Sequence, residues 1–310
     1  MSASGLLRVA RRTPWIAGAI VIAAVTGAAP GAAPYVQVLG IAQDAGIPQA
    51  GCRKACCTRG RREMVASLAL ADPASGRWWL FDATPDFPEQ LAAMQPASGC
   101  TLAGVFLTHA HIGHYLGLVH FGREVMGAHG VPVWAMPRMR AFLETNGPWD
   151  QLVRLHNIEL RPLAADSSID LGGGLHVTPF RVPHRDEYSE TVGFRIASRT
   201  RAAIFVPDID KWERWDRSIE SAVAGVDVAW LDGTFHDAAE LPGRNLSEIP
   251  HPLIVESVER FRVLPAGERS KIRFIHFNHT NAAARPGSRE RRALERAGFR
   301  VAKAGERVPF

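Results

Sequence analysis

The stretch Gly104–Leu118, GVFLTHAHIGHYLGL, decides the fold. Its apolar start, Gly104–Leu107, predicts a buried strand, and polar residues follow directly at the carboxyl end of that strand. Three of them, His109, His111 and His114, lie within six positions of one another. Each imidazole has two ring nitrogens that need partners when buried, so packing explains such a cluster poorly. Grouped imidazoles are nitrogen ligands for a transition metal, and we expect a metal site here rather than three separately hydrogen-bonded histidines.

Short apolar runs bounded by Gly, Pro and Asp predict strands on both sides of this stretch, and longer periodic stretches predict helices. Because strands and helices are grouped at intervals, we expect two sheets packed face to face with helices outside, an α/β (α+β) architecture in one domain over residues 35–310. The expected strands are Tyr35–Ile41, Ser67–Ala71, Trp78–Phe81, Val131–Ala135, Ile158–Leu163, Leu175–Val182, Thr191–Ala197, Ala202–Val206, Val226–Leu231 and Arg273–Phe277, and the expected helices are Pro137–Asn146, Leu253–Val263 and Arg289–Ala297.

The first residues are predicted to be a secretory signal. Arg8, Arg11 and Arg12 precede an apolar stretch, Trp15–Ala29, and small residues follow. This order is typical of an exported chain, so we expect cleavage after Ala28, removing residues 1–28, and a periplasmic or secreted protein. An uncleaved membrane anchor is the alternative, although the apolar run is shorter than the roughly 20 residues that a spanning helix needs.

The formal net charge of the chain is +5, with 36 basic and 31 acidic residues. Residues 1–28 hold three Arg and no acid, so the remainder has 33 basic and 31 acidic residues, a net charge of +2. No basic patch interleaved with aromatic residues argues for nucleic acid. We expect a small-molecule substrate, no nucleic-acid partner and no stable membrane insertion after signal cleavage. The sequence does not predict an oligomeric state.

The motif Thr108–His114, THAHIGH, resembles the T-H-x-H-x-D-H signature of the metallo-β-lactamase superfamily. The phrases around the motifs resemble the branch of pyrroloquinoline quinone (PQQ) synthesis protein B, in which a loop like Gly46–Gln49 precedes a cysteine cluster. The resemblance implies a four-layer αββα sandwich with its site at the strand ends along one edge. Gly113 stands where the superfamily has an Asp that helps to bind a second metal ion.

The same resemblance implies the metal ligands. His109, His111 and His184 make the first site, His114 and His279 make the second, and Asp208 bridges the two. Nitrogen and carboxylate donors suit zinc, iron or manganese. Because Gly113 offers no donor, the second site is expected to keep three ligands, to be weak or to be absent, so one or two ions are expected. Asp82 or Asp86 is expected to orient a histidine, and helix capping is the alternative for Asp86.

Asp232 and His251 resemble the pair that protonates the leaving group in the phosphodiesterase branch of the superfamily. A carboxylate fixes the tautomer of an imidazole, and the imidazole then serves as general acid. With Asp208 they are the expected catalytic residues; the alternative is that Asp232 caps a turn and His251 caps the following helix. His236 lies near Asp232 in the sequence and is a further candidate. The remaining histidines are expected to be structural or surface residues: His120, His129, His156, His176 and His276.

Four cysteines are present, and three of them are clustered at Cys52, Cys56 and Cys57. An exported protein is allowed disulfides, whereas thiolates at this spacing also suit a structural zinc ion. The two alternatives are close to even, and either is a structural role. Only Cys100 lies outside the cluster, so a tetrahedral zinc site has to recruit Cys100 or a histidine.

The expected activity is metal-assisted hydrolysis of an ester, a phosphodiester or a similar bond by an enzyme of this superfamily, with one or two zinc ions and with iron or manganese as alternatives. The resemblance to PQQ synthesis protein B implies a different class, an iron-dependent oxidoreductase or another PQQ-related role. A non-catalytic binding protein on the same fold is the third hypothesis. The Trp-rich segments Asn146–Trp149 and Lys211–Trp215 are expected either to wall a substrate pocket or to pack in the core.

Overall fold

The computed structural model describes Met1 and residues 33–310. Apart from Met1, the predicted signal, residues 1–28, lies outside the described residues. No helix within the described ranges is long and apolar enough to cross a membrane.

Residues 33–310 contain two seven-stranded sheets. The first has the order β14-β1-β2-β3-β4-β5-β6, and the second has the order β13-β12-β11-β10-β9-β8-β7. The strands of the first sheet are β1 (Tyr35–Gly40), β2 (Ser67–Asp72), β3 (Arg77–Phe81), β4 (Thr101–Phe106), β5 (Val131–Ala135), β6 (Ile158–Pro162) and β14 (Arg307–Pro309). Those of the second are β7 (Ile169–Gly172), β8 (Leu175–Arg181), β9 (Val192–Ala197), β10 (Ala202–Val206), β11 (Val228–Asp232), β12 (Ile272–Ile275) and β13 (Arg300–Val301).

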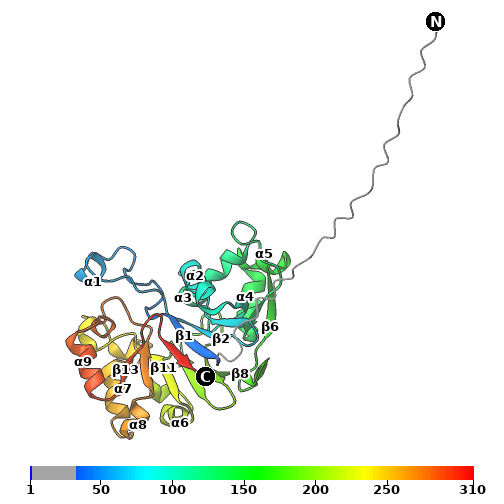
Figure 1. The fold of residues 1–310 in the computed structure, drawn as a ribbon. Coiled ribbons are helices and arrows are strands. Elements are labelled where there is room, and N and C mark those ends of the chain that lie inside the picture. The colour runs from blue at the N-terminus through cyan, green and yellow to red at the C-terminus, as the bar shows by residue number, and fades with distance from the viewer. Residues whose placement is uncertain (2–32) are drawn as a thin grey trace.

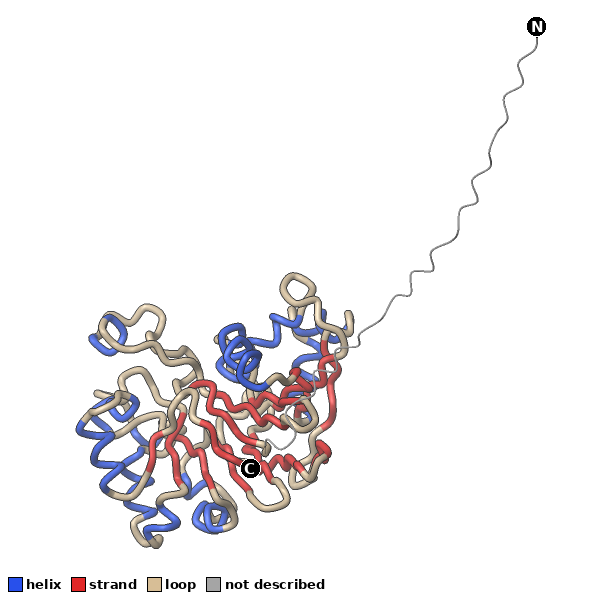
Figure 2. Tube along the Cα trace, viewed as in Figure 1, coloured by secondary structure: helices blue, strands red, loops and turns tan. Residues whose placement is uncertain are grey.

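Helices flank the two sheets on their outer sides, which gives the four layers that the resemblance implies (Figure 1). Figure 2 shows the strands gathered between two groups of helices. One group is α2 (Phe87–Ser98), α3 (Ile112–Tyr115), α4 (Pro137–Thr145) and α5 (Trp149–Arg154), and the other is α6 (Ile219–Ala224), α7 (Ile254–Phe261), α8 (Ala266–Arg269) and α9 (Arg289–Arg296). The short helix α1 (Ala55–Thr58) lies on a loop that extends from the body above α9 (Figure 1).

Aromatic side chains hold the two sheets together. Phe81 and Phe106, on the inner face of the first sheet, stack with ring centroids 5.3 Å apart. Both meet the edge of Phe194 from the second sheet, at 5.5 Å and 5.7 Å. All three side chains are fully buried, and burial of each stabilises the fold by about 1.5–3 kcal/mol. The alternation of the strands thus turns one face of each sheet inward, as the sequence predicts.

The direction of the strands decides where the functional residues gather. Strands β3 to β6 run parallel to one another, and so do β10 to β13. Their carboxyl ends therefore point to one edge of the sandwich, where a ligand site is expected. The motif after β4, Asp208 after β10 and His276 after β12 all lie at that edge.

The predicted strands and the three predicted helices are confirmed, with ends that shift by at most three residues. Val226–Leu231, for example, is observed at Val228–Asp232, and Gly104–Leu107 at Thr101–Phe106. Elements of two to six residues escaped prediction, among them β7, β13, β14, α5 and α6. Such short elements hold too few residues to show a period. Their positions depend on distant partners, as when β14 pairs with β1.

Candidate metal centre

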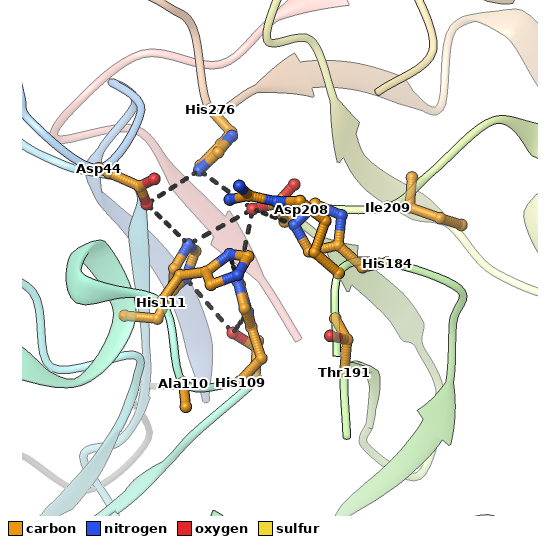
Figure 3. Close-up of polar contacts among 12 residues, drawn as sticks. Asp44, His109, Ala110, His111, His184, Thr191, Asp208, Ile209 and His276 are labelled. Carbon is orange, nitrogen blue, oxygen red and sulfur yellow. Dashed lines mark hydrogen bonds and ion pairs between the residues drawn. The ribbon is translucent and has the colours of Figure 1, made fainter. Parts of the chain in front are cut away.

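Four predicted ligands from three separate segments converge at the sheet edge (Figure 3). Nε2 of His109 lies 2.8 Å from Nδ1 of His111, and both rings face His184. Oδ2 of Asp208 lies 3.5 Å from Nε2 of His109 and 3.3 Å from Nε2 of His184. The donor atoms of all four residues lie within 4.8 Å of one another. We call this group the first metal position.

Asp82 explains why the motif turns its histidines inward. Asp82 directly follows β3, and its buried carboxylate accepts hydrogen bonds from the backbone N–H and the hydroxyl of Thr108, at 2.8 and 2.9 Å. It also contacts Nδ1 of His114 at 2.7 Å, which leaves Nε2 of that ring directed at the site. Asp82 is thus the carboxylate that orients a histidine. Asp86 instead accepts hydrogen bonds from Arg62 and from the backbone of Val65.

A second group lies beside the first and differs from the predicted one. Nε2 of His114 is 3.3 Å from Oδ1 of Asp44, and Nε2 of His276 is 3.8 Å from the same oxygen. His276, which was expected to be structural or a surface residue, therefore lies where His279 was predicted. We call Asp44, His114 and His276 the second group.

The placement of His279 in the second group is wrong for a local reason. Strand β12 ends at Ile275, and His276 has a φ of 66°, a left-handed conformation that turns the chain sharply. His276 stays at the strand end, as His109 does, while His279 is carried away from His114. His279 joins the cysteines instead.

The three clustered cysteines and His279 form a separate group, which we call the cysteine centre. Their sulfur and nitrogen atoms lie within 4.8 Å of one another, and Cys52, Cys56 and Cys57 are not joined by a disulfide. Cys100 lies elsewhere, with its thiol directed at the carbonyl of Asp72. Three sulfurs and one imidazole are a common ligand set of structural zinc, so the geometry favours the zinc alternative over a disulfide.

Asp232 and His251 meet at the edge of the first metal position. Nδ1 of His251 lies 2.9 Å from Oδ2 of Asp232 and 3.1 Å from Oδ1 of Asp208. The hydroxyl and N–H of Thr234 hold Oδ1 of Asp232. Burial opposes a positive charge on His251, but the carboxylates of Asp232 and Asp208 outweigh it and raise its pKa to about 10. His236 is not part of this group.

Protonation states at the first metal position suit metal ligation. Burial, together with the neighbouring His114, holds the pKa of His109 well below its usual value, so that its ring is neutral with a free lone pair. Burial acts against the charge of Asp208, but the surrounding histidines, His184 first, keep its pKa well below the usual value. A neutral imidazole and an ionised carboxylate are the forms that bind metals.

Unpartnered polar atoms provide a direct test of whether these residues fit a metal ion. Leaving a buried polar atom without a partner costs about 1–3 kcal/mol, so several together in one place are not expected in a stable fold. The buried atoms that make no hydrogen bond and border this edge are Oδ1 of Asp44, Nε2 of His114, both ring nitrogens of His184, Oδ1 of Asp208 and Nε2 of His276. All belong to the two groups just described, and the donor set fits one or more divalent cations.

The site also has partners that the sequence did not reveal. Nε2 of His111 lies 3.0 Å from a carboxylate oxygen of Glu187, so that Nδ1 is the nitrogen left facing the first metal position. Nothing in the local sequence marks Glu187, or Asp44, as part of the site. The two Trp-rich segments differ in their surroundings. Trp149 packs on Tyr115, the residue directly after the histidine motif, with ring centroids 4.8 Å apart, whereas Trp212 and Trp215 are buried in the core.

Comparison with known proteins agrees with this fold. A family model described as the beta-lactamase superfamily domain matches residues 77–277. A coenzyme PQQ synthesis protein B from Ruegeria pomeroyi is 28% identical over 300 residues, covering 87% of this chain and 98% of the relative.

Two solved structures share the architecture. The zinc-bound PqqB of Methylobacterium extorquens matches with a TM-score of 0.74 at 24% identity, over 89% of this chain and all of that chain. A diphosphatase of the PhnP family matches with a TM-score of 0.63 at 22% identity, over 89% and 97%. The chain therefore belongs to the β-lactamase superfamily, within which it is similar to PQQ synthesis protein B.

Proposed function

We propose that the protein is a metal-dependent hydrolase that cleaves an ester, phosphodiester or similar bond of a small molecule, with zinc as its metal. The proposal rests on one observation. Unpartnered metal-ligand atoms converge on one edge of the sandwich, and a proton donor, His251, lies beside them. His251, charged and held by Asp232, lies 3.1 Å from the carboxylate of Asp208. An imidazole oriented by a carboxylate beside a metal position is the arrangement of a general acid.

When bound, the metal lowers the pKa of its water to about 7 and polarises a carbonyl or phosphoryl oxygen. The residues of the chain supply the rest. His109, His111 and His184 would hold the ion, and Asp208 faces both these residues and the second group. Asp232 fixes Nδ1 of His251, and the protonated ring gives its proton to the leaving oxygen. The proton is restored from solvent or from the attacking water.

An aromatic surface beside the motif supports a small organic substrate. Phe142 packs on Tyr115 at 5.3 Å and on Tyr188 at 5.5 Å. Tyr188 is exposed, with 62% of its surface accessible, and it follows Glu187, the partner of His111. An apolar or aromatic portion of a substrate would lie against these rings while its scissile bond meets the first metal position.

A second candidate function is an oxidation related to PQQ synthesis. The observation that favours it is the similarity to PQQ synthesis protein B over 87% of the chain. Two or three imidazoles with one carboxylate also suit iron. Metal content separates the candidates: zinc with turnover in the absence of oxygen supports hydrolysis, and iron with oxygen uptake supports oxidation.

The test uses the full chain loaded with zinc and two chromogenic substrates, bis(p-nitrophenyl) phosphate and p-nitrophenyl acetate. We expect turnover of at least one of them, abolished by His109→Ala and by chelation. His129→Ala is the matched control because His129 is exposed and outside all the groups described. Equal rates for His109→Ala and the unaltered chain would disprove the proposal, as would zinc-loaded protein that hydrolyses neither substrate nor a wider ester panel.

A further inference from the structure

Gly113 lies inside the histidine motif, in helix α3. The space that a side chain at this position would fill is occupied by Asp44. A Cβ atom built on Gly113 would lie 2.5 Å from the Cα of Asp44 and closer still to Oδ1 of Asp44. Cβ contacts under 3.0 Å are essentially never observed. Gly113 does not have a positive φ, so its backbone conformation would accept any residue. The absence of a side chain at position 113 therefore serves one purpose, to admit Asp44.

The backbone delivers Asp44 to this place from the far end of the sequence. After β1, Ala42 forms isolated bridges with Val65, just before β2, and with Phe277, just after β12. The N–H of Gln43 donates to the carbonyl of Phe277 at 2.8 Å, and the N–H of Phe277 donates to the carbonyl of Ile41 at 2.8 Å. This pairing places Asp44 next to His276, as Figure 3 shows.

The contact of Asp44 with His114 is close without being a hydrogen bond. Oδ1 of Asp44 and Nε2 of His114 are 3.3 Å apart, yet both atoms are buried and neither makes a hydrogen bond. Nε2 of His276 is unpartnered in the same way. Three donor atoms that face one another without bonding are arranged as ligands around a common point.

The fourth member is Asp208. Its Oδ2 lies 3.8 Å from Nε2 of His114 and 3.9 Å from Nε2 of His276, and it also faces His109 and His184. Ligand atoms about 2.0–2.2 Å from a tetrahedral zinc ion lie about 3.3–3.6 Å from one another. The distances of Nε2 of His114 and Nε2 of His276 from the two carboxylates run from 3.3 to 3.9 Å, which is within a few tenths of an ångström of that range.

We propose that Asp44 supplies the carboxylate ligand of a second metal position, completed by His114, His276 and Asp208. The superfamily motif places a carboxylate at the position of Gly113. In this chain the carboxylate comes instead from Asp44, in the loop after β1, and the glycine leaves room for it. The inference rests on the proposed function for its catalytic meaning, since two adjacent ions would share Asp208. Its ligand is a divalent transition metal such as zinc, iron or manganese.

Metal stoichiometry tests the inference without any substrate. Asp44→Ala and Gly113→Ala are compared with the unaltered chain by elemental analysis after equilibration with zinc, and the cobalt-substituted proteins by their absorption spectra. Asp44→Ala removes a donor, while Gly113→Ala removes none and only fills the space. We expect each to bind one equivalent fewer, with the first metal position retained. Gly267→Ala is the control, because a Cβ at Gly267 meets nothing within 4 Å.

An unchanged metal content in Asp44→Ala would overturn the inference, and so would an unchanged metal content in His114→Ala. If Gly113→Ala is unstable, Asp44→Ala decides alone, since Asp44 is partly exposed and Oδ1 makes no hydrogen bond. The result is distinguishable from failure of the proposed function: a chain that loses one equivalent in Asp44→Ala but hydrolyses nothing retains the second metal position and lacks the activity.

Discussion

The two donor clusters of this protein are built in opposite ways. The histidine–aspartate groups lie at the ends of strands, and His109, His114, Asp208 and His276 are each almost fully buried. The three cysteines of the cysteine centre lie on the loop around α1, and each member of the centre, His279 included, is only partly buried. A rigid frame with unpartnered donors is suited to hold ions in a defined geometry for chemistry, and a loop with thiolates is suited to be held by an ion.

The two clusters nevertheless share their supports. The segment after β12 gives His276 to one and His279 to the other, and the segment after β1 gives Asp44 to one and leads to Cys52 in the other. The N–H of Gln49 donates to the sulfur of Cys57 at 3.4 Å. We infer that the cysteine centre holds the loop that carries Asp44 in place, while the proposed chemistry belongs to the strand ends.

The largest effect is expected from His184→Ala. Both ring nitrogens of His184 are unpartnered, so the change removes no hydrogen bond and the fold should persist. We expect loss of the ion at the first metal position and a fall in hydrolysis of at least about 1,000-fold, because the ion supplies the nucleophile. Elemental analysis and initial rates measure this. Loss of the cysteine-bound ion as well would break the division between the two clusters.

A smaller effect is expected from His251→Gln, which keeps a polar group but removes the acid. Substrates with an alkyl leaving group should slow by about 100-fold, and p-nitrophenyl substrates should slow much less because their leaving group needs no proton. Rates for the two substrate classes are compared at pH 7, below the pKa of about 10, where His251 is protonated. An equal loss for both classes would assign His251 a positioning role instead.

The smallest catalytic effect is expected from Cys56→Ser, which acts on the cysteine centre. We expect loss of one metal equivalent and a decrease of about 3 kcal/mol in the free energy of unfolding, since an ion bound only by the folded chain stabilises it. Activity should fall no more than about tenfold, because Gln43 still ties the Asp44 segment to Phe277. Urea unfolding and rates measure both quantities, and the exposed Lys54→Ala is the control.

Abolished activity in Cys56→Ser with the first metal ion still bound would contradict the division of labour between the clusters. It would show that the cysteine centre orders the strand ends themselves.

Much of this molecule was predictable from its sequence. The strands are marked by apolar runs, and the first metal position is marked by residues directly after strands, so that His109, His184 and Asp208 were found together. Family order identified Asp232 and His251, which meet as expected. His109, His184 and Asp208 follow strands and Asp232 ends one, so the carboxyl ends of these strands place them at one edge.

The second group was only partly predictable because its geometry depends on distant packing. Whether His276 or His279 lies in the second group depends on the left-handed conformation of His276 at the end of its strand. The sequence does not indicate that conformation. Asp44 approaches His114 only because Ala42 pairs with Phe277 and because Gly113 leaves room. The same packing carries His279 to the cysteines, which required a fourth partner that the sequence did not name.

The pairing of Ala42 with Phe277 has a consequence for the order of events as the chain matures. Ligands for the second metal position come from the first and one of the last strands, so a ribosome must release nearly the whole polypeptide before they meet. Contacts of such sequence separation form late and slowly. Ion uptake at this position would therefore report that folding is complete, and partly synthesised chains would be unable to capture metal there.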